Sequence, residues 1–171
     1  ATARTPRTPS AASGRATSQR ASKSWNTGCC GMAESAPTQF PPVRLCASSD
    51  LAEKGLAFVF DVLQWREPMR AFVLRFDGRV VGYLNRCVHV PSELDWQPGE
   101  FLDSRQEFIL CATHGAAYEP SSGRCVAGPC GRGRLTTLHV KERDGGVYWY
   151  PSRDTRPLSY SEPPGTKEST A

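Results

Sequence analysis

The chain has 171 residues, of which 39% are hydrophobic and 22% are charged, and its formal net charge is +4 at pH 7. This length suits one ordinary domain, and the composition is that of a globular protein rather than a disordered or membrane-embedded chain. No stretch approaches the roughly 20 apolar residues that span a bilayer. We therefore expect a soluble protein without a membrane partner.

The N-terminal segment carries the whole charge excess. Residues 1–31 contain five basic residues and no acidic residue, so the remainder of the chain is near neutral at −1, which argues against a nucleic-acid partner. The segment lacks Leu, Ile, Val and Phe, so we expect a disordered tail over residues 1–36. Met32 opens the run Met-Ala-Glu-Ser, which suggests that residues 1–31 are upstream sequence translated in error or a vector remnant. An organellar transit peptide is the alternative, although the segment does not favour an amphipathic helix.

From Phe40 onward, short runs rich in branched and aromatic residues alternate with Gly, Pro and Asp, which is typical of β-strands and turns. In chain order, strands are predicted at residues 57–63, 71–76, 80–84, 107–111, 117–119, 124–126, 137–142 and 147–150. Tight turns are predicted at Asp77-Gly78, Ser121-Ser122-Gly123 and Asp144-Gly145-Gly146. The sequence offers no convincing long amphipathic helix. We expect an all-β, small antiparallel domain over residues 37–150 and a flexible C-terminal tail over residues 151–171.

Two short Cys–His pairs closely follow two of these strands. The first is Cys87-Val88-His89, the second is Cys111-Ala112-Thr113-His114, and 21 residues lie between them. A rigid sheet can hold two such loops in place. Two thiols and two imidazoles are therefore expected to form one four-ligand metal site.

Three interpretations of this site are open. The four residues could be ordinary thiols and imidazoles without a metal, or a Cys2His2 set for tetrahedral zinc. Common zinc fingers pair Cys with Cys and His with His, whereas here each loop supplies one residue of each type. An iron–sulfur cluster is the third interpretation, and it uses the mixed pairing directly.

The pattern C-x-H, a spacer and C-x2-H resembles that of the Rieske family. The resemblance covers roughly residues 42–150 and extends to His114-Gly115, Tyr118, Gly123-Arg124-Cys125, Gly128-Pro129 and Leu135. These further residues are similar to the second ligand loop and the proline-containing covering loop of the family. The resemblance implies a Rieske-like fold with one [2Fe–2S] cluster, in which Cys87 and Cys111 bind one iron while His89 and His114 bind the other.

Other positions suggest a branch of that family. Cytochrome bc-type members join the two ligand loops by a disulfide and direct a hydroxyl at a cluster sulfur, whereas the corresponding positions here are Ser92, Thr113 and Ala116. This implies a ferredoxin-like member of lower potential within the class range of about −150 to +300 mV. Cys125 and Cys130 could pair with each other, but in the absence of a secretion signal we expect reduced thiols.

The resemblance implies an electron carrier rather than an enzyme. The sequence after Tyr150 has no histidine for the catalytic iron site of Rieske oxygenases, and the chain has no dinucleotide-binding fingerprint. We expect a cytoplasmic ferredoxin, or the ferredoxin component of an oxygenase or reductase system. Its partners would be a separate flavin- or NAD(P)H-linked reductase and an oxygenase or reductase that accepts the electron. A zinc-stapled interaction module and a cluster-based redox sensor are the alternatives.

Overall fold

The structure is a computed structural model that describes residues 40–159. The tail expected over residues 1–36 and the last part of the C-terminal tail, residues 160–171, lie outside this range. Within the described range the regular structure is β apart from one short 3-10 helix, η1 (Ser48–Asp50), and every pair of named strands is antiparallel. No helix in this range is long and apolar enough to cross a membrane. The predicted all-β antiparallel class is confirmed.

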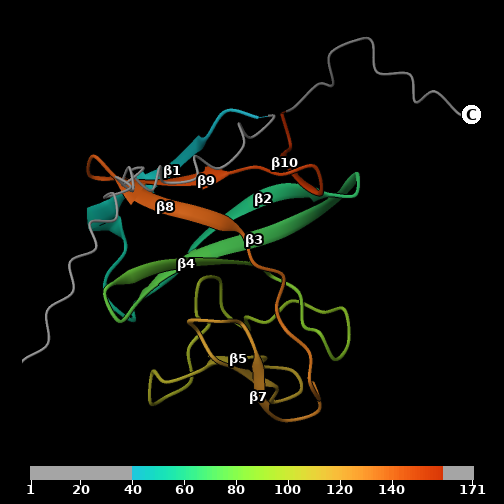
Figure 1. Cartoon of the computed structure of the whole chain (residues 1–171). Helices are drawn as coiled ribbons and strands as arrows, with labels where there is room; N and C mark the ends of the chain where they lie inside the picture. The colour runs from blue at the N-terminus through green and yellow to red at the C-terminus, as the bar shows by residue number, and fades with distance from the viewer. Residues whose placement is uncertain (1–39, 160–171) are drawn as a thin grey trace, which may run out of the picture. The chain divides into compact units, whose positions relative to one another are not determined.

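Ten strands of the described range form three sheets (Figure 1). Sheet A has the order β1-β9-β8, sheet B the order β10-β2-β3-β4, and sheet C the order β5-β6-β7. The strands are β1 Val43–Ala47, β2 Phe58–Gln64, β3 Glu67–Phe76, β4 Arg79–Leu84, β5 Ile109–Leu110, β6 Ala117–Tyr118, β7 Cys125–Ala127, β8 His139–Arg143, β9 Gly146–Tyr150 and β10 Thr155–Pro157.

Strand β3 determines how the sheets stack. Four consecutive residues, 71–74, are completely buried, although successive side chains of a strand point to opposite faces. Sheet B is therefore covered on both faces. Ala71 packs in one core with Trp149 of sheet A, whereas Phe72 and Leu74 pack in another core that includes sheet C and the Cys–His loops. Figure 1 accordingly shows sheet B between sheet A and the β5–β7 region.

The turns between hairpin strands follow the expected chemistry in two cases and depart from it in a third. Asp77-Gly78 joins β3 to β4 and Asp144-Gly145 joins β8 to β9, and all four residues have positive φ, as a type I′ turn requires. The turn from β2 to β3 consists of Trp65 and Arg66, with φ of 51° and 73°. No glycine or asparagine marks this turn in the sequence.

Two strands were not predicted, and one of them moves the domain boundary. Strand β1 pairs with β9, and β10 pairs with β2 as the edge strand of sheet B. The folded domain therefore continues past the expected end at residue 150 to Pro157. An edge position explains why this strand tolerates a proline, which has no N–H to donate to a neighbour. Thr155 is buried, and its hydroxyl lies 3.0 Å from that of Ser152, so this part of the expected tail is anchored.

Candidate metal centre

The first ligand loop, residues 85–95, begins directly after β4. Asn85 is 3% exposed and closes the base of the loop, because its amide nitrogen donates to Asp95 at 2.7 Å and its amide oxygen accepts from the N–H of Leu94 at 2.8 Å. Inside the loop, the N–H of Cys87 donates to the carbonyl of Ser92 at 2.8 Å. The loop is thus held at its base and across its middle, which fixes the backbone beside Cys87.

The second ligand loop, residues 111–116, is the connection between β5 and β6. The N–H of Cys111 donates to Ala116 at 2.8 Å, and the N–H of Gly115, whose φ is +68°, donates back to Cys111 at 2.8 Å. The N–H of Ala112 donates to the carbonyl of Leu94 at 2.9 Å and so ties this loop to the first. Two loops that are far apart in sequence therefore form one rigid unit.

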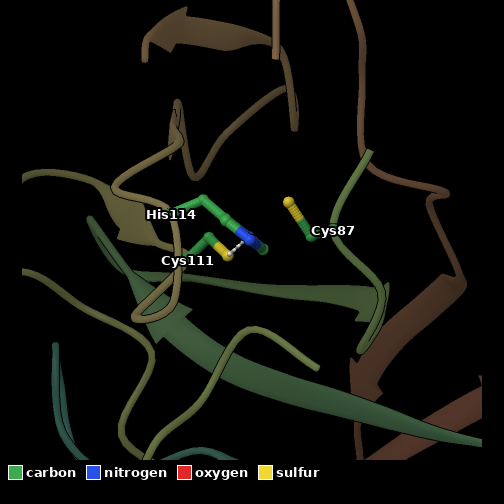
Figure 2. A group of neighbouring side chains, drawn as sticks. All are labelled: Cys87, Cys111 and His114. Carbon is green, nitrogen blue, oxygen red and sulfur yellow. Dashed lines mark hydrogen bonds between the residues drawn. The ribbon is translucent and has the colours of Figure 1, made fainter. Parts of the chain in front are cut away.

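The structure brings three of the four expected ligands into one group. The donor atoms of Cys87, Cys111 and His114 all lie within 4.8 Å of one another, and Figure 2 shows the two sulfurs and the His114 ring facing a common space. The Nδ1 atom of His114 lies 4.0 Å from Cys111 Sγ. His89 is outside this group, but its exposed ring lies edge-on to that of His114 with 5.0 Å between centroids. The arrangement has a buried sulfur side and an imidazole side that solvent reaches.

Backbone N–H groups surround both sulfurs. Burial raises the pKa of the Cys87 thiol, but hydrogen bonds from the Tyr118 hydroxyl and from the N–H groups of Val90 and His89 outweigh burial, so this pKa is lowered. Burial also raises the pKa of the Cys111 thiol, which remains raised although the N–H groups of His114 and Thr113 donate to it, because the neighbouring sulfur disfavours a second negative charge. Each loop thus directs two N–H groups at its own cysteine, an arrangement that stabilises thiolate.

Tyr118 in β6 was not predicted to contact a ligand. Its hydroxyl lies 3.3 Å from Cys87 Sγ and accepts the N–H of Val88 at 3.2 Å. Burial and the hydrogen bond to Cys87 raise the pKa of Tyr118. The hydroxyl therefore stays protonated and can donate a hydrogen bond to the sulfur. One feature of the sequence could have pointed to Tyr118, namely that it is among the residues that resemble the Rieske family. No feature of the sequence pointed to Asn85.

The covering loop, residues 127–133, corrects the expectation about Cys125 and Cys130. These residues form a disulfide with 5.9 Å between their Cα atoms, where reduced thiols were expected. Gly128 and Gly131 both have positive φ and turn the chain back, which places Cys130 beside β7. Reduced thiols were expected from the cellular compartment alone, and the sequence does not show that the chain turns back at Gly128 and Gly131.

The donor set fits a [2Fe–2S] cluster. Two buried cysteine sulfurs, each facing two backbone N–H donors, suit an anionic iron–sulfur group. Two imidazoles lie next to each other at the same site, and a Rieske centre combines two cysteines with two histidines. A structural zinc site would need all four donors converging on one ion. Here the His89 ring lies beside His114 rather than within the group of three.

Several solved structures share the fold of this chain. The chain is similar to the ferredoxin of carbazole 1,9a-dioxygenase from Nocardioides aromaticivorans IC177, with 20% identity and a TM-score of 0.52 over 66% of this chain and all of that one. It is also similar to a chain in the complex of reduced oxygenase and oxidised ferredoxin of carbazole 1,9a-dioxygenase, with 21% identity and a TM-score of 0.50 over 64% of this chain and 92% of that one.

A terminal oxygenase gives a similar but partial match. For that of carbazole 1,9a-dioxygenase from Novosphingobium sp. KA1, the identity is 24% and the TM-score 0.52, over 75% of this chain and 34% of that chain. No curated protein matched the chain in sequence. The model of the Rieske [2Fe-2S] domain family matches residues 42–141. Because this match spans more than half of the chain, the protein belongs to the Rieske [2Fe-2S] domain family and binds one [2Fe–2S] cluster.

Proposed function

We propose that this protein is a one-electron carrier whose cluster is held by four residues, Cys87, His89, Cys111 and His114. The observation that supports this most is the division of the site into a buried pair of sulfurs and a pair of imidazoles on the solvent side. A carrier needs a cofactor that is sheltered from water on one side and close to a partner protein on the other. The two ligand loops bury the sulfurs and leave the imidazoles at the surface, which meets both requirements.

When bound, a [2Fe–2S] cluster with two histidine ligands accepts and releases one electron at a potential of about −150 to +300 mV. In this proposal Cys87 and Cys111 hold one iron as thiolates, and His89 and His114 hold the other as neutral imidazoles. The N–H groups directed at the sulfurs stabilise negative charge there. The loops are braced through Asn85 and Leu94, so the ligands need little rearrangement between redox states.

The imidazole side would be the contact surface for redox partners. Val88 and Val90 flank His89 and are each 42% exposed, so an apolar rim adjoins the exposed rings. Such a rim favours protein contact. One similar solved structure is a complex of ferredoxin with the oxygenase of carbazole 1,9a-dioxygenase. By analogy, the proposed acceptor is an oxygenase or reductase, and the proposed donor is a flavin- or NAD(P)H-linked reductase.

The first experiment is anaerobic purification of the full chain, with assays for iron, sulfide and zinc. Absorbance and low-temperature EPR spectra would be recorded before and after dithionite. We expect two irons and two sulfides per chain and a rhombic EPR signal that appears only on reduction. Zinc without sulfide, and no EPR signal, would contradict the proposal.

Ligand variants test the assignment of individual residues. Cys111→Ser and His89→Ala are expected to lose most of the iron and sulfide, and the His89 variant is the sharper test because this residue lies outside the close group of three. The matched control is His139→Ala, which removes an exposed histidine from β8 in sheet A. If His89→Ala kept both irons with an unchanged EPR spectrum, the histidine assignment would be wrong.

A further inference from the structure

The base of the covering loop is closed by backbone hydrogen bonds. The N–H of Cys125 donates to the carbonyl of Gly133 at 2.9 Å, and the N–H of Gly133 donates to the carbonyl of Cys130 at 3.0 Å. The disulfide joins Cys125 to Cys130 within this small ring of contacts. Both cysteines are at most 9% exposed. One covalent bond therefore links strand β7 to the far side of the covering loop.

The covering loop packs against the backbone of the second ligand loop. A Cβ atom added at Gly128 would lie 2.6 Å from the carbonyl oxygen of Gly115 and 2.9 Å from Cα of Ala116. Glycine is thus required at position 128 because the two backbones are in direct contact. Gly115 follows His114, so the covering loop lies directly against the segment that positions this histidine.

The same loop reaches the first ligand loop at its other end. A Cβ atom added at Gly133 would overlap the side chain of Val88, the residue between Cys87 and His89. The disulfide also lies against strand β6. Cys125 is the register partner of Tyr118, and Cys130 Sγ is 4.0 Å from the carbonyl oxygen of Ala117. The covering loop therefore contacts both ligand loops, and the disulfide is attached to the strand whose tyrosine touches Cys87.

We propose that the Cys125–Cys130 disulfide is a redox-sensitive clamp that holds the covering loop onto both ligand loops, so that opening it loosens the cluster site. The effect on the cluster rests on the proposed function. The effect of the disulfide on the covering loop does not depend on it. A dithiol supplies the two electrons and two protons that convert the disulfide into two thiols, and it becomes a disulfide itself. No ligand bond is broken in this step, but the loop loses its covalent closure.

The test compares the full-length protein with the double variant C125S/C130S, with Cys46→Ala as a control that removes the buried thiol between sheets A and B. Alkylation and mass spectrometry before and after dithiothreitol would establish whether residues 125 and 130 are paired. Cluster loss to an iron chelator would be followed by absorbance. We expect the pair to be protected before reduction and the cluster half-life of the double variant to be shorter by on the order of tenfold, with the control unchanged.

Hydrogen exchange gives a readout that does not depend on the cluster. In metal-free protein, faster amide exchange at Gly115, Ala116 and Gly133 in the double variant would support the clamp even if iron and sulfide assays contradicted the electron-carrier proposal. Free thiols at positions 125 and 130 in the purified protein would overturn the clamp proposal. So would equal exchange rates, or an equal cluster half-life, in the double variant and the wild-type protein. If C125S/C130S does not fold, the variant C125A/C130A provides the same comparison without new polar groups in the buried pair.

Discussion

The hydroxyl of Tyr118 is a single group that we expect to influence the cluster. It lies 3.3 Å from Cys87 Sγ, and a hydroxyl that donates to a cysteine ligand stabilises the more negative, reduced state. Tyr118→Phe is therefore expected to lower the midpoint potential by about 60 mV, which for one electron corresponds to roughly 1.4 kcal/mol, near the lower end for a hydrogen bond to a charged group. A redox titration followed by circular dichroism would measure it.

Tyr148→Phe is the matched control for this prediction. Tyr148 lies in β9 of sheet A, where Arg143 stacks over its ring at 4.8 Å. Removing its hydroxyl should leave the potential unchanged. A potential that stays constant or rises in Tyr118→Phe would mean that the tyrosine does not donate to the sulfur.

At the residue scale, the sequence identifies residues whose type alone indicates metal chemistry. The proposed ligands Cys87, His89, Cys111 and His114 stood out because thiols and imidazoles rarely cluster by chance. Asn85 could not be found in this way, since an asparagine acquires its role only when Leu94 and Asp95 return to it in the fold. The spacing of Cys125 and Cys130 allows a disulfide, but reduced thiols were expected from the compartment, and only the fold shows that the chain turns back far enough to join them.

At the scale of elements, the turn between β2 and β3 is locally unfavourable. Trp65 and Arg66 both adopt positive φ, and the left-handed region costs an ordinary residue about 1 kcal/mol. Trp65 is 70% exposed, so its side chain offers little packing in return. The double substitution W65N/R66G supplies the Asn-Gly pair that a type I′ turn prefers. It is expected to raise the free energy of unfolding by about 1 kcal/mol, as measured by urea denaturation.

An Asn-Gly pair in another turn tests whether the gain in stability is specific to the turn at Trp65 and Arg66. The control is Asp77→Asn, which creates Asn-Gly in a turn whose residues already have positive φ. It should change stability little. An equal gain in both variants would show that relief of strain at Trp65 and Arg66 is not the cause.

The strands that sequence reasoning found are those with a dense run of branched and aromatic residues. Strands β2, β3, β4 and β9 fall within one or two residues of the prediction at most ends, although β3 begins four residues earlier. Strands β1 and β10 have weak patterns and exist because β9 and β2 offer them free edges. Strand β5 is shorter than predicted because the Asp103 carboxylate accepts the N–H groups of Glu107 and Phe108 and holds them out of the sheet.

At the scale of the whole molecule, one ion pair links two sheets. Arg75 in β3 of sheet B donates from both terminal nitrogens to Glu142 in β8 of sheet A, at 3.0 and 2.9 Å. Ser48 also donates to Glu142. The hydrogen bond from Arg75 holds the pKa of Glu142 below its ordinary value. A carboxyl group whose pKa is lower in the folded state stabilises the protein above its unfolded pKa and loses this contribution as pH falls through the folded value.

Glu142→Gln is therefore expected to lower the free energy of unfolding at pH 7 by about 0.5 kcal/mol, the size of a solvent-screened pair. As the pH falls through the lowered pKa of Glu142, the carboxyl of the wild-type protein becomes protonated, and the two proteins should converge in stability. Denaturation at a series of pH values would measure the difference. Glu107→Gln, an exposed residue outside this pair, is the control. A difference between wild type and Glu142→Gln that persisted at low pH would exclude the charge as its cause.

The division of the interior into separate cores has a consequence for how the protein is made. Two of the cores of the described range, centred on Trp149 and on Val147, lie between sheets A and B and contain neither Cys87 nor Cys111, whereas the third contains both. A newly synthesised chain can therefore complete the sandwich of sheets A and B before any iron arrives. We therefore expect iron to enter after sheets A and B have folded, rather than to be needed for their folding.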